Sequence, residues 1–118
     1  MVRYIILIII LFNLNLIAGE LDSNQITKIA DAIKLEENSP HFPYGVHYYA
    51  IHDEIRCRQI CINTISNNYL RWRRQRTNAD YVDFLSRKYD PVNARSWAAN
   101  VRMILGSAFC AQINKNHP

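Results

Sequence analysis

One stretch constrains this chain more than any other: an amphipathic helix that ends in an acid and then breaks into a tight loop. Four positions beyond the last apolar residue, the same helix face carries Glu37. The eight residues that follow, 38–45, include two prolines and a glycine, which predict a loop. The apolar stripe therefore points at a carboxyl group where the helix ends. Its members, at three-and-four spacing, are Ile26, Ile29, Ala30 and Ile33.

Glu37 is the main candidate for a chemically active residue. A carboxyl at the edge of an apolar face loses hydration in its charged form, so it keeps its proton more readily, as a general acid near neutral pH must. The adjacent Glu36 leaves two interpretations open. It either disfavours the charged form of Glu37 further or is itself the working acid. A third interpretation is that both acids simply end a solvated helix.

The first nineteen residues have the layout of a secretory signal peptide. A positive start at Arg3 is followed by an apolar run over 4–16 and by small residues before Glu20. The run is interrupted and is shorter than the roughly 20 apolar residues that cross a bilayer. We therefore expect cleavage after 1–19, export to the periplasm or the extracellular space, and no stable membrane span afterwards. An uncleaved anchor is the alternative.

The charge of the chain favours anionic partners. The formal net charge is +4, and loss of the leader would remove only Arg3. A mildly basic exported protein is attracted to cell-wall polymer, lipopolysaccharide or anionic lipid. Nucleic acid is a poor partner outside the cytoplasm, so we predict none.

Three cysteines form an odd set in an oxidising compartment. Cys57 and Cys61 are four residues apart on one predicted helix, where a disulfide between them would be strained. A disulfide from either to Cys110 is the more plausible pairing. Zinc binding by these thiols with nearby histidines matches no standard ligand spacing, so we predict no metal and no cofactor.

Periodicity and capping residues predict a mainly α-helical fold, with about four helices around a cleft and a short irregular or β insertion after the first helix. The helices are expected over about 22–37, 52–74, 77–90 and 95–105, in a single domain of residues 20–105. The expected caps are Asp22, with Gln25 three residues on, for the first helix and Thr77 for the third. Segment 46–51 favours a short strand or an extended conformation. Residues 106–118 should form a frayed tail. The inward positions of the last three helices are Ile55, Ile60, Cys61, Ile65, Tyr69, Trp72, Tyr81, Val82, Phe84, Leu85, Tyr89, Trp97, Val101, Ile104 and Leu105.

A cluster of arginines ends the second predicted helix, over 71–76. Cations in a last helical turn interact favourably with the helix dipole, so a solvated helix end explains the cluster without a ligand. Binding of lipid headgroups or an acidic polymer is the alternative.

Five blocks of sequence, in this order, resemble one known family. The chain is similar to the small exported bacterial proteins of lysozyme-like, soluble-lytic-transglycosylase-like type, over nearly all of residues 26–105. The blocks are 29–37, 43–46, 58–68 with 71–72, 83–91 and 97–101.

The resemblance implies a lysozyme-type fold that cleaves peptidoglycan glycan strands between N-acetylmuramic acid and N-acetylglucosamine. Glu37 occupies the position of the family's acid, at the end of the first helix. The chain departs from the family where Asn38 and Ser39 replace two glycines and where Glu36 replaces a small residue. It also has Asp90 in place of a cysteine that would be the partner of Cys61.

The number of carboxylates separates two mechanisms. Ordinary glycosidases use two, about 5 or 6.5–9.5 Å apart. The resemblance implies that a lytic transglycosylase can use one Glu as acid and then as base, because the C6 hydroxyl of muramic acid is the nucleophile. Nothing in the sequence marks out a second acid, so the single-carboxylate mechanism fits better. The downstream candidates are Asp53, Glu54, Asp83 and Asp90.

A sugar site also needs flat apolar faces beside hydrogen-bonding groups. The alternative is that Tyr89 and Trp97 belong to the core and that Gly45 only closes a turn. The predicted substrate-binding residues are Tyr44, Gly45, Asn63, Tyr89, Trp97 and Asn100.

Two functions follow from these features. The first is an exported peptidoglycan-cleaving enzyme whose partner is the glycan strand and whose acid and base is Glu37. The second is a catalytically inactive lysozyme-fold module that binds or inhibits at the cell envelope. The replacement of the family's glycines by Asn38 and Ser39 favours the second.

Overall fold

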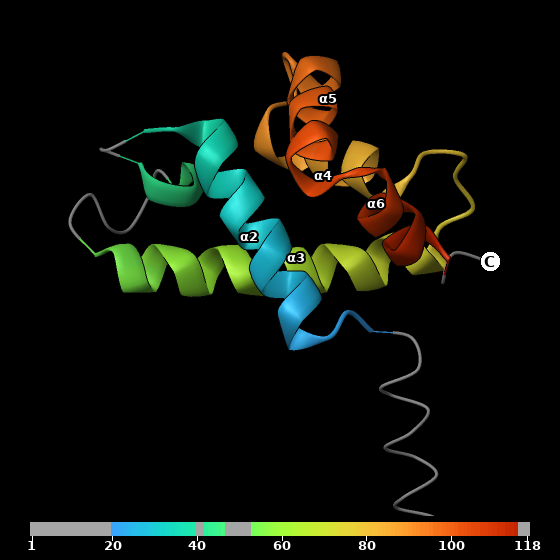
Figure 1. Ribbon diagram of the computed structural model, residues 1–118, viewed down its shortest axis with the longest axis horizontal. Coiled ribbons are helices and arrows are strands. Elements are labelled where there is room, and N and C mark those ends of the chain that lie inside the picture. Colours follow the sequence, from blue (N-terminus) through green and yellow to red (C-terminus); the bar gives the residue numbers. More distant parts are fainter. Residues whose placement is uncertain (1–19, 40–41, 47–52, 116–118) are drawn as a thin grey trace, which may run out of the picture.

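A long helix, α3 (Glu54–Arg74), runs along one side of the molecule (Figure 1). The computed structural model describes residues 20–39, 42–46 and 53–115, and these contain five α-helices, one short 3-10 helix and no strand. The predicted mainly α fold is confirmed. The leader, 1–19, and the extended segment expected at 46–51, apart from Val46, lie outside the described residues. The remaining elements are α2 (Ser23–Glu37), η1 (Pro43–Gly45), α4 (Tyr81–Tyr89), α5 (Ala94–Leu105) and α6 (Ser107–Asn114).

Three helices begin at an aspartate whose side chain accepts a backbone N–H of the first turn. Asp22 caps α2 in a reciprocal capping box with Gln25, as the sequence predicts. Asp53 caps α3 through the N–H of Arg56. The cap of α4 is Asp80 rather than the expected Thr77, because Thr77 Oγ1 instead accepts the N–H of Ala79 inside the preceding loop.

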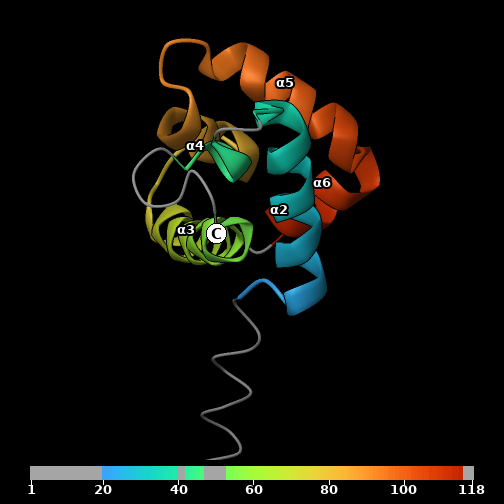
Figure 2. The same cartoon turned by 90° about the vertical axis from the view of Figure 1, so that its left-hand side faces the viewer.

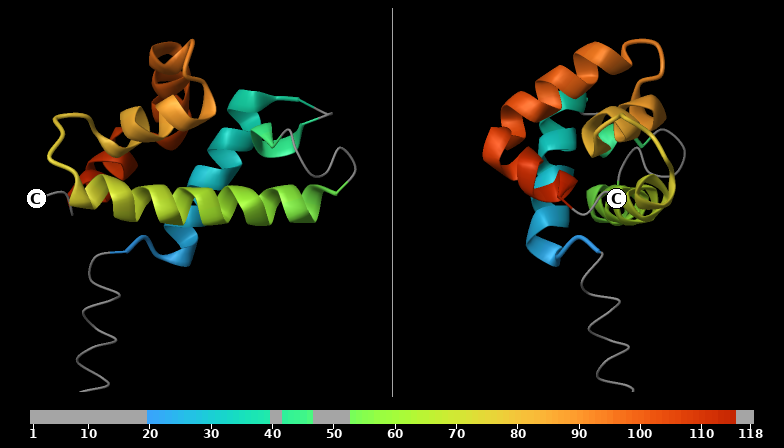
Figure 3. Two further views of the ribbon diagram at one scale, coloured as in Figure 1. Left: turned by 180° about the vertical axis from the view of Figure 1, so that it is seen from behind. Right: turned by 90° about the vertical axis from the view of Figure 1, so that its right-hand side faces the viewer.

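The helices enclose one core. Helix α2 packs on α3 and α5, while α4 contacts α3, α5 and α6. Figure 2 shows α2 and α5 along one side of the molecule, with α4 above α3. Seen from behind, α3 runs across the full width of the group (Figure 3). Every member of the predicted α2 stripe except Ile26 is buried, and Ile26 packs half-buried against the core.

An aromatic cluster holds the C-terminal half of α3 against α4 and α6. Tyr69 and Tyr81 meet edge to face with ring centroids 4.9 Å apart. The ring centroids of Trp72 and Tyr69 are 5.4 Å apart. The buried hydroxyls have partners: Tyr69 donates to the carbonyl of Ile113, and Tyr81 donates to that of Ile65. These bonds remove the cost of burying two phenols.

The structure corrects three expectations about the core. Residues 107–114 form helix α6 instead of a frayed tail, and Ile113 is fully buried. The sequence places Ile55 and Ile104 inward, but they are 84% and 42% exposed. Ile55 falls in the first turn of α3, which extends past the end of the core, so periodicity overstates its burial. Ile104 lies beside the buried Leu105 at the edge of the α5 stripe.

Candidate functional site

The site is built at the end of α2, where the chain turns sharply. Glu37 is the last helical residue, and Asn38 follows in the left-handed conformation (φ 39°) with its N–H bonded to the carbonyl of Lys34. Ser39 Oγ then accepts the N–H of Phe42. This turn brings η1 back alongside α2. In the described residues of the predicted loop, 38–39 leave the helix and 43–45 form η1, which contacts α2.

Gly45 of η1 lies directly against the carboxyl of Glu37. Its φ of +68° is left-handed, and a Cβ added to it would lie 2.8 Å from Glu37 Oε1. A side chain there would be both strained and too close to the carboxyl. Gly45 thus permits a close approach of backbone to the candidate acid and also closes the turn.

Trp97 of α5 also contacts the carboxyl of Glu37. Its Nε1–H donates to Glu37 Oε1 over 3.3 Å, and the residue is only 2% exposed. The indole stacks on the ring of Tyr89, with centroids 5.3 Å apart and planes 7° from parallel. The Tyr89 hydroxyl donates to the sulfur of Cys61 over 3.3 Å. We call Trp97, Tyr89 and Cys61 the support cluster of Glu37.

The support cluster keeps its protons at neutral pH. Burial raises the pKa of the Cys61 thiol to about 11, with smaller opposing effects from the Tyr89 hydrogen bond and Arg58. Burial also raises the pKa of the Tyr89 hydroxyl well above its usual range, and the nearby Cys61 and Glu37 add to the shift. The neutral side chains of Tyr89 and Cys61 thus lie behind the N–H donor of Trp97 that contacts Glu37.

Glu36 has different surroundings from Glu37. Its Oε1 accepts a hydrogen bond from Asn100 Nδ2 over 3.3 Å, on the exposed side of α5. Both acids are half-buried, but the bond to Glu36 is made at the surface and the bond to Glu37 is made by a buried indole. The two carboxyls therefore differ in their hydrogen-bond partners: Trp97 for Glu37 and Asn100 for Glu36.

The remaining predicted substrate residues are less closely gathered. Tyr44 is buried, and its hydroxyl accepts a hydrogen bond from Arg58 Nη1 at 3.3 Å. Asn63 is exposed on α3 and accepts a hydrogen bond from Gln59 of its own helix. The structure thus brings Gly45, Tyr89 and Trp97 around Glu37. It places Asn100 beside Glu36 and leaves Asn63 apart from these contacts.

An open depression of about 500 Å³ borders the helix end. Asn38 and Ser39, the two residues that follow Glu37, form part of its wall. The ammonium of Lys34 forms an ion pair with the carboxylate of Glu54 at its edge. This surface was not predicted from the sequence, although Leu35 falls opposite the apolar stripe and Lys34 falls at its side, and both are exposed. Its full lining is Lys34, Leu35, Asn38, Ser39, Pro43 and Glu54.

Each of the four candidates for a second acid already has a structural partner. Asp53 caps α3, and Glu54 pairs with Lys34. Asp83 forms an ion pair with Arg102 at 2.7 Å. Asp90 accepts the N–H of Asn93 in the turn between α4 and α5. These contacts account for the four carboxylates as parts of the scaffold.

The predicted disulfide is absent, since no bond joins Cys57 or Cys61 to Cys110. Cys61 lies in the support cluster, whereas Cys110 lies on α6 near Asp80 and Arg102. Within the described ranges no three His, Cys, Asp or Glu side chains are grouped to hold a metal ion. His41, His47 and His52, which the zinc alternative needs, fall outside those ranges. None of the described helices combines the length and hydropathy of a membrane span.

The fold and site together define a small, mainly α-helical protein with a half-buried carboxyl at a helix end, held between a glycine and an indole. Comparisons with protein-family models, with curated proteins and with solved structures found no match to this chain.

Proposed function

We propose that this protein is an exported, lysozyme-like enzyme that cleaves peptidoglycan glycan strands, with Glu37 as its single acid and base. The observation that carries the proposal is the position of Glu37. It ends α2, its carboxyl lies against Gly45, and a buried indole donates to it. The sequence blocks that resemble lytic transglycosylases point to the same residue.

The contacts of Glu37 suit a group that gives up a proton and later takes one back. Gly45 and Trp97 both contact Oε1 of Glu37, and these contacts limit the conformational freedom that the carboxyl loses when it meets the substrate. The N–H of Trp97 stabilises the carboxylate formed after the proton has left. The neutral support cluster adds no negative charge to oppose that step. Because Trp97 is buried, we assign it to positioning Glu37 rather than to stacking on a sugar ring.

The proposed reaction has two proton transfers. Glu37 first donates its proton to the glycosidic oxygen as the bond from that oxygen to C1 of the muramic acid breaks. The carboxylate then accepts the proton of the C6 hydroxyl on the same sugar, while O6 forms a bond to C1. The products are a free hydroxyl on N-acetylglucosamine and a 1,6-anhydro end on muramic acid. No water is consumed, and Glu37 ends protonated as it began.

A single carboxylate is sufficient for this route, which agrees with the structural roles of the other acids. Asp53, Glu54 and Asp83 are engaged in a cap or an ion pair. A hydrolase of the two-carboxylate kind would need one of them, or Glu36, released and placed opposite Glu37.

The depression at the helix end is the proposed place for the glycan. Glu37 itself is not among its lining residues, and Asn38, the next residue, is. Leu35 and Pro43 offer apolar surface there, next to the polar side chains of Asn38 and Ser39. This mixture is what pyranose rings require. Asn63 and Asn100 are exposed, so both remain candidates for contacts further along a strand.

Clearing of purified cell wall embedded in a gel tests the proposal. We expect the parent protein and Glu36→Gln to clear the wall and Glu37→Gln to leave it intact, with circular dichroism showing that all three are folded. Absence of clearing by the folded parent would overturn the enzymatic proposal. Retained pelleting of that inactive protein with cell wall would support the binding module instead.

A further inference from the structure

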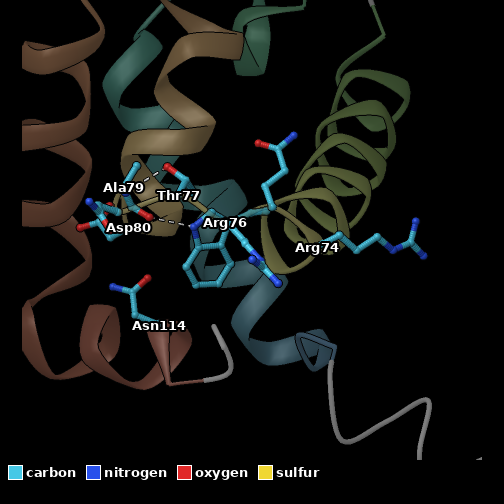
Figure 4. Close-up of a pocket in the computed structure, with 9 residues that line it drawn as sticks. Arg74, Arg76, Thr77, Ala79, Asp80 and Asn114 are labelled. Carbon is cyan, nitrogen blue, oxygen red and sulfur yellow. Dashed lines mark hydrogen bonds between the residues drawn. The ribbon is translucent and has the colours of Figure 1, made fainter.

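A second open depression, of about 830 Å³, lies at the C-terminal end of α3 (Figure 4). Figure 1 places this end of α3 far along the molecule from η1 and the end of α2, so the depression is separate from the surroundings of Glu37. In Figure 4, Arg76 lies between Arg74 on one side and Thr77 on the other. The full lining is Trp72, Arg74, Gln75, Arg76, Thr77, Asn78, Ala79, Asp80 and Asn114.

The helix dipole does not explain every arginine at this end of α3. Arg71, Arg73 and Arg74 fall in the last turn of α3, where a cation is favourable. Arg76 lies beyond the C-cap, Gln75, yet lines the depression with Arg74. Among the described residues no carboxylate forms an ion pair with Arg71, Arg74 or Arg76, and all three are exposed. Within the described part of the chain, positive charge therefore gathers here, and the lining holds one acid, Asp80.

The single acid in the lining, Asp80, is held by contacts within the scaffold. Its carboxylate accepts the N–H of Asp83 at 2.8 Å as the cap of α4. It also lies 3.4 Å from Arg102, a half-buried cation on α5. Asp80 thus serves the scaffold, and its single negative charge against the two arginines leaves the lining with a net positive charge.

Other side chains in the lining can donate hydrogen bonds to an anion. Asn114 accepts the N–H of Tyr81 with Oδ1, which leaves its Nδ2 hydrogens as donors. Thr77 accepts the N–H of Ala79 and still carries its own hydroxyl hydrogen. In Figure 4 the side chain of Arg74 extends away from Thr77 and Asn114, so the donors of the lining are spread out. Donors spread in this way suit a ligand that carries several oxyanion groups.

We propose that this depression binds phosphate groups of an anionic polymer. Phosphate presents several acceptor oxygens at once and matches the fork of donors on arginine. A membrane surface fits less well, because binding to one also requires apolar side chains that insert beside the cations. None of the exposed large apolar residues in the described part of the chain lies between 71 and 80; they are Leu35, Ile55, Val92, Met103 and Ile104.

Calorimetric titration with inorganic polyphosphate tests the proposal. Loss of charge-assisted hydrogen bonds should weaken binding by the double variant Arg74→Gln/Arg76→Gln by about tenfold or more. The matched control is Arg87→Gln/Lys88→Gln, which removes the same charge from exposed positions in the last turn of α4. The control should keep its affinity within about twofold, since long-range charge alone is screened by salt. Inorganic phosphate should compete with polyphosphate for the parent protein.

Three results would overturn the proposal: no binding of polyphosphate by the parent, equal losses in the two double variants, or failure of phosphate to compete. Vesicles of phosphatidylcholine with phosphatidylglycerol provide the second arm. Sedimentation with these vesicles, without affinity for polyphosphate, would assign the arginines to a membrane surface instead. Both double variants should unfold thermally at the same temperature as the parent. Any loss of affinity for polyphosphate then comes from the site and not from unfolding. Cleavage of cell wall plays no part in this test, so its outcome is independent of Glu37.

Discussion

The indole nitrogen of Trp97 donates a hydrogen bond to the carboxyl of Glu37, across 60 residues of sequence. This bond ties α5 to the end of α2. Because Trp97 also stacks on Tyr89, the orientation of the carboxyl depends on the packing of α4 as well. The candidate acid is thus positioned by three helices and by Gly45.

Trp97→Phe tests this positioning. The variant keeps a ring to stack on Tyr89 but removes the N–H donor to Glu37. We expect cleavage of cell wall to fall about tenfold, because a hydrogen bond to a charged group is lost, and the free energy of unfolding to fall by about 1–2 kcal/mol. Rates of solubilisation of cell wall and urea unfolding measure the two effects. Tyr89→Phe, which keeps the ring and loses only the hydroxyl, should cleave nearly as fast as the parent. Unchanged cleavage by Trp97→Phe would show that the indole does not position the acid.

Gly45→Ala should move the carboxyl of Glu37. The new Cβ would lie 2.8 Å from Oε1, on a backbone at φ +68°, so the carboxyl must shift. We expect a loss of about 1–3 kcal/mol in stability and a marked loss of cleavage per folded molecule. Gly106→Ala is the control, because its φ is +91° but a Cβ there meets no atom within 4 Å. It should lose stability and keep its specific activity. Equal specific activity in the two variants would contradict the contact.

The Cys61 thiol makes stability depend on pH at the alkaline end. Its pKa is raised from 9.0 to about 11 in the folded state, so the folded protein holds the proton more tightly than the unfolded chain. This contribution to the free energy of unfolding is fully present below about pH 9 and is lost as the pH rises through about 11. The shift corresponds to roughly 2–3 kcal/mol.

Comparison with Cys61→Ala isolates this effect from the other buried cysteines and tyrosines. In urea unfolding, the parent and the variant should differ in free energy of unfolding at neutral pH, and this difference should become smaller above about pH 9. A difference that stays constant to about pH 11 would show that the thiol has no raised pKa.

Ile113→Ala tests whether α6 belongs to the core. Ile113 is fully buried, and its carbonyl accepts the hydroxyl of Tyr69 at 2.7 Å. Truncation of a buried isoleucine should lower the free energy of unfolding by about 2–5 kcal/mol. The neighbouring Gln112 is exposed, and Gln112→Ala should change it by less than about 0.5 kcal/mol. Equal effects of the two substitutions in chemical unfolding would indicate a frayed end.

Local signals in the sequence predicted most of the helices. The capping box at Asp22 and the prolines after Glu37 and Tyr89 mark helix ends through nearest-neighbour chemistry, and the structure has α2 and α4 ending there. Helix α6 was missed because only Phe109, Cys110 and Ile113 are large and apolar in a short segment. Its stability comes from tertiary contacts such as Tyr69 to Ile113, and a single sequence carries no sign of these.

Prediction of the site was limited in the same way. The spacing of the α2 stripe singled out Glu37, and the glycine in the following loop lies against it in the structure. The sequence marked Trp97 and Tyr89 as sugar-stacking or core residues, but not as a support for the carboxyl. That role depends on how α5 crosses α2, which residue spacing does not determine. The bond from Tyr89 to Cys61 depends likewise on packing between α3 and α4.

Mass analysis of the fragments released from purified peptidoglycan tests the central claim most directly. The account predicts fragments that end in 1,6-anhydro muramic acid from the parent and from Glu36→Gln, and none from folded Glu37→Gln. Fragments with the same anhydro end from Glu37→Gln would contradict the account, because another residue would then supply the proton. Fragments with only a reducing end from the parent would contradict the single-carboxylate route.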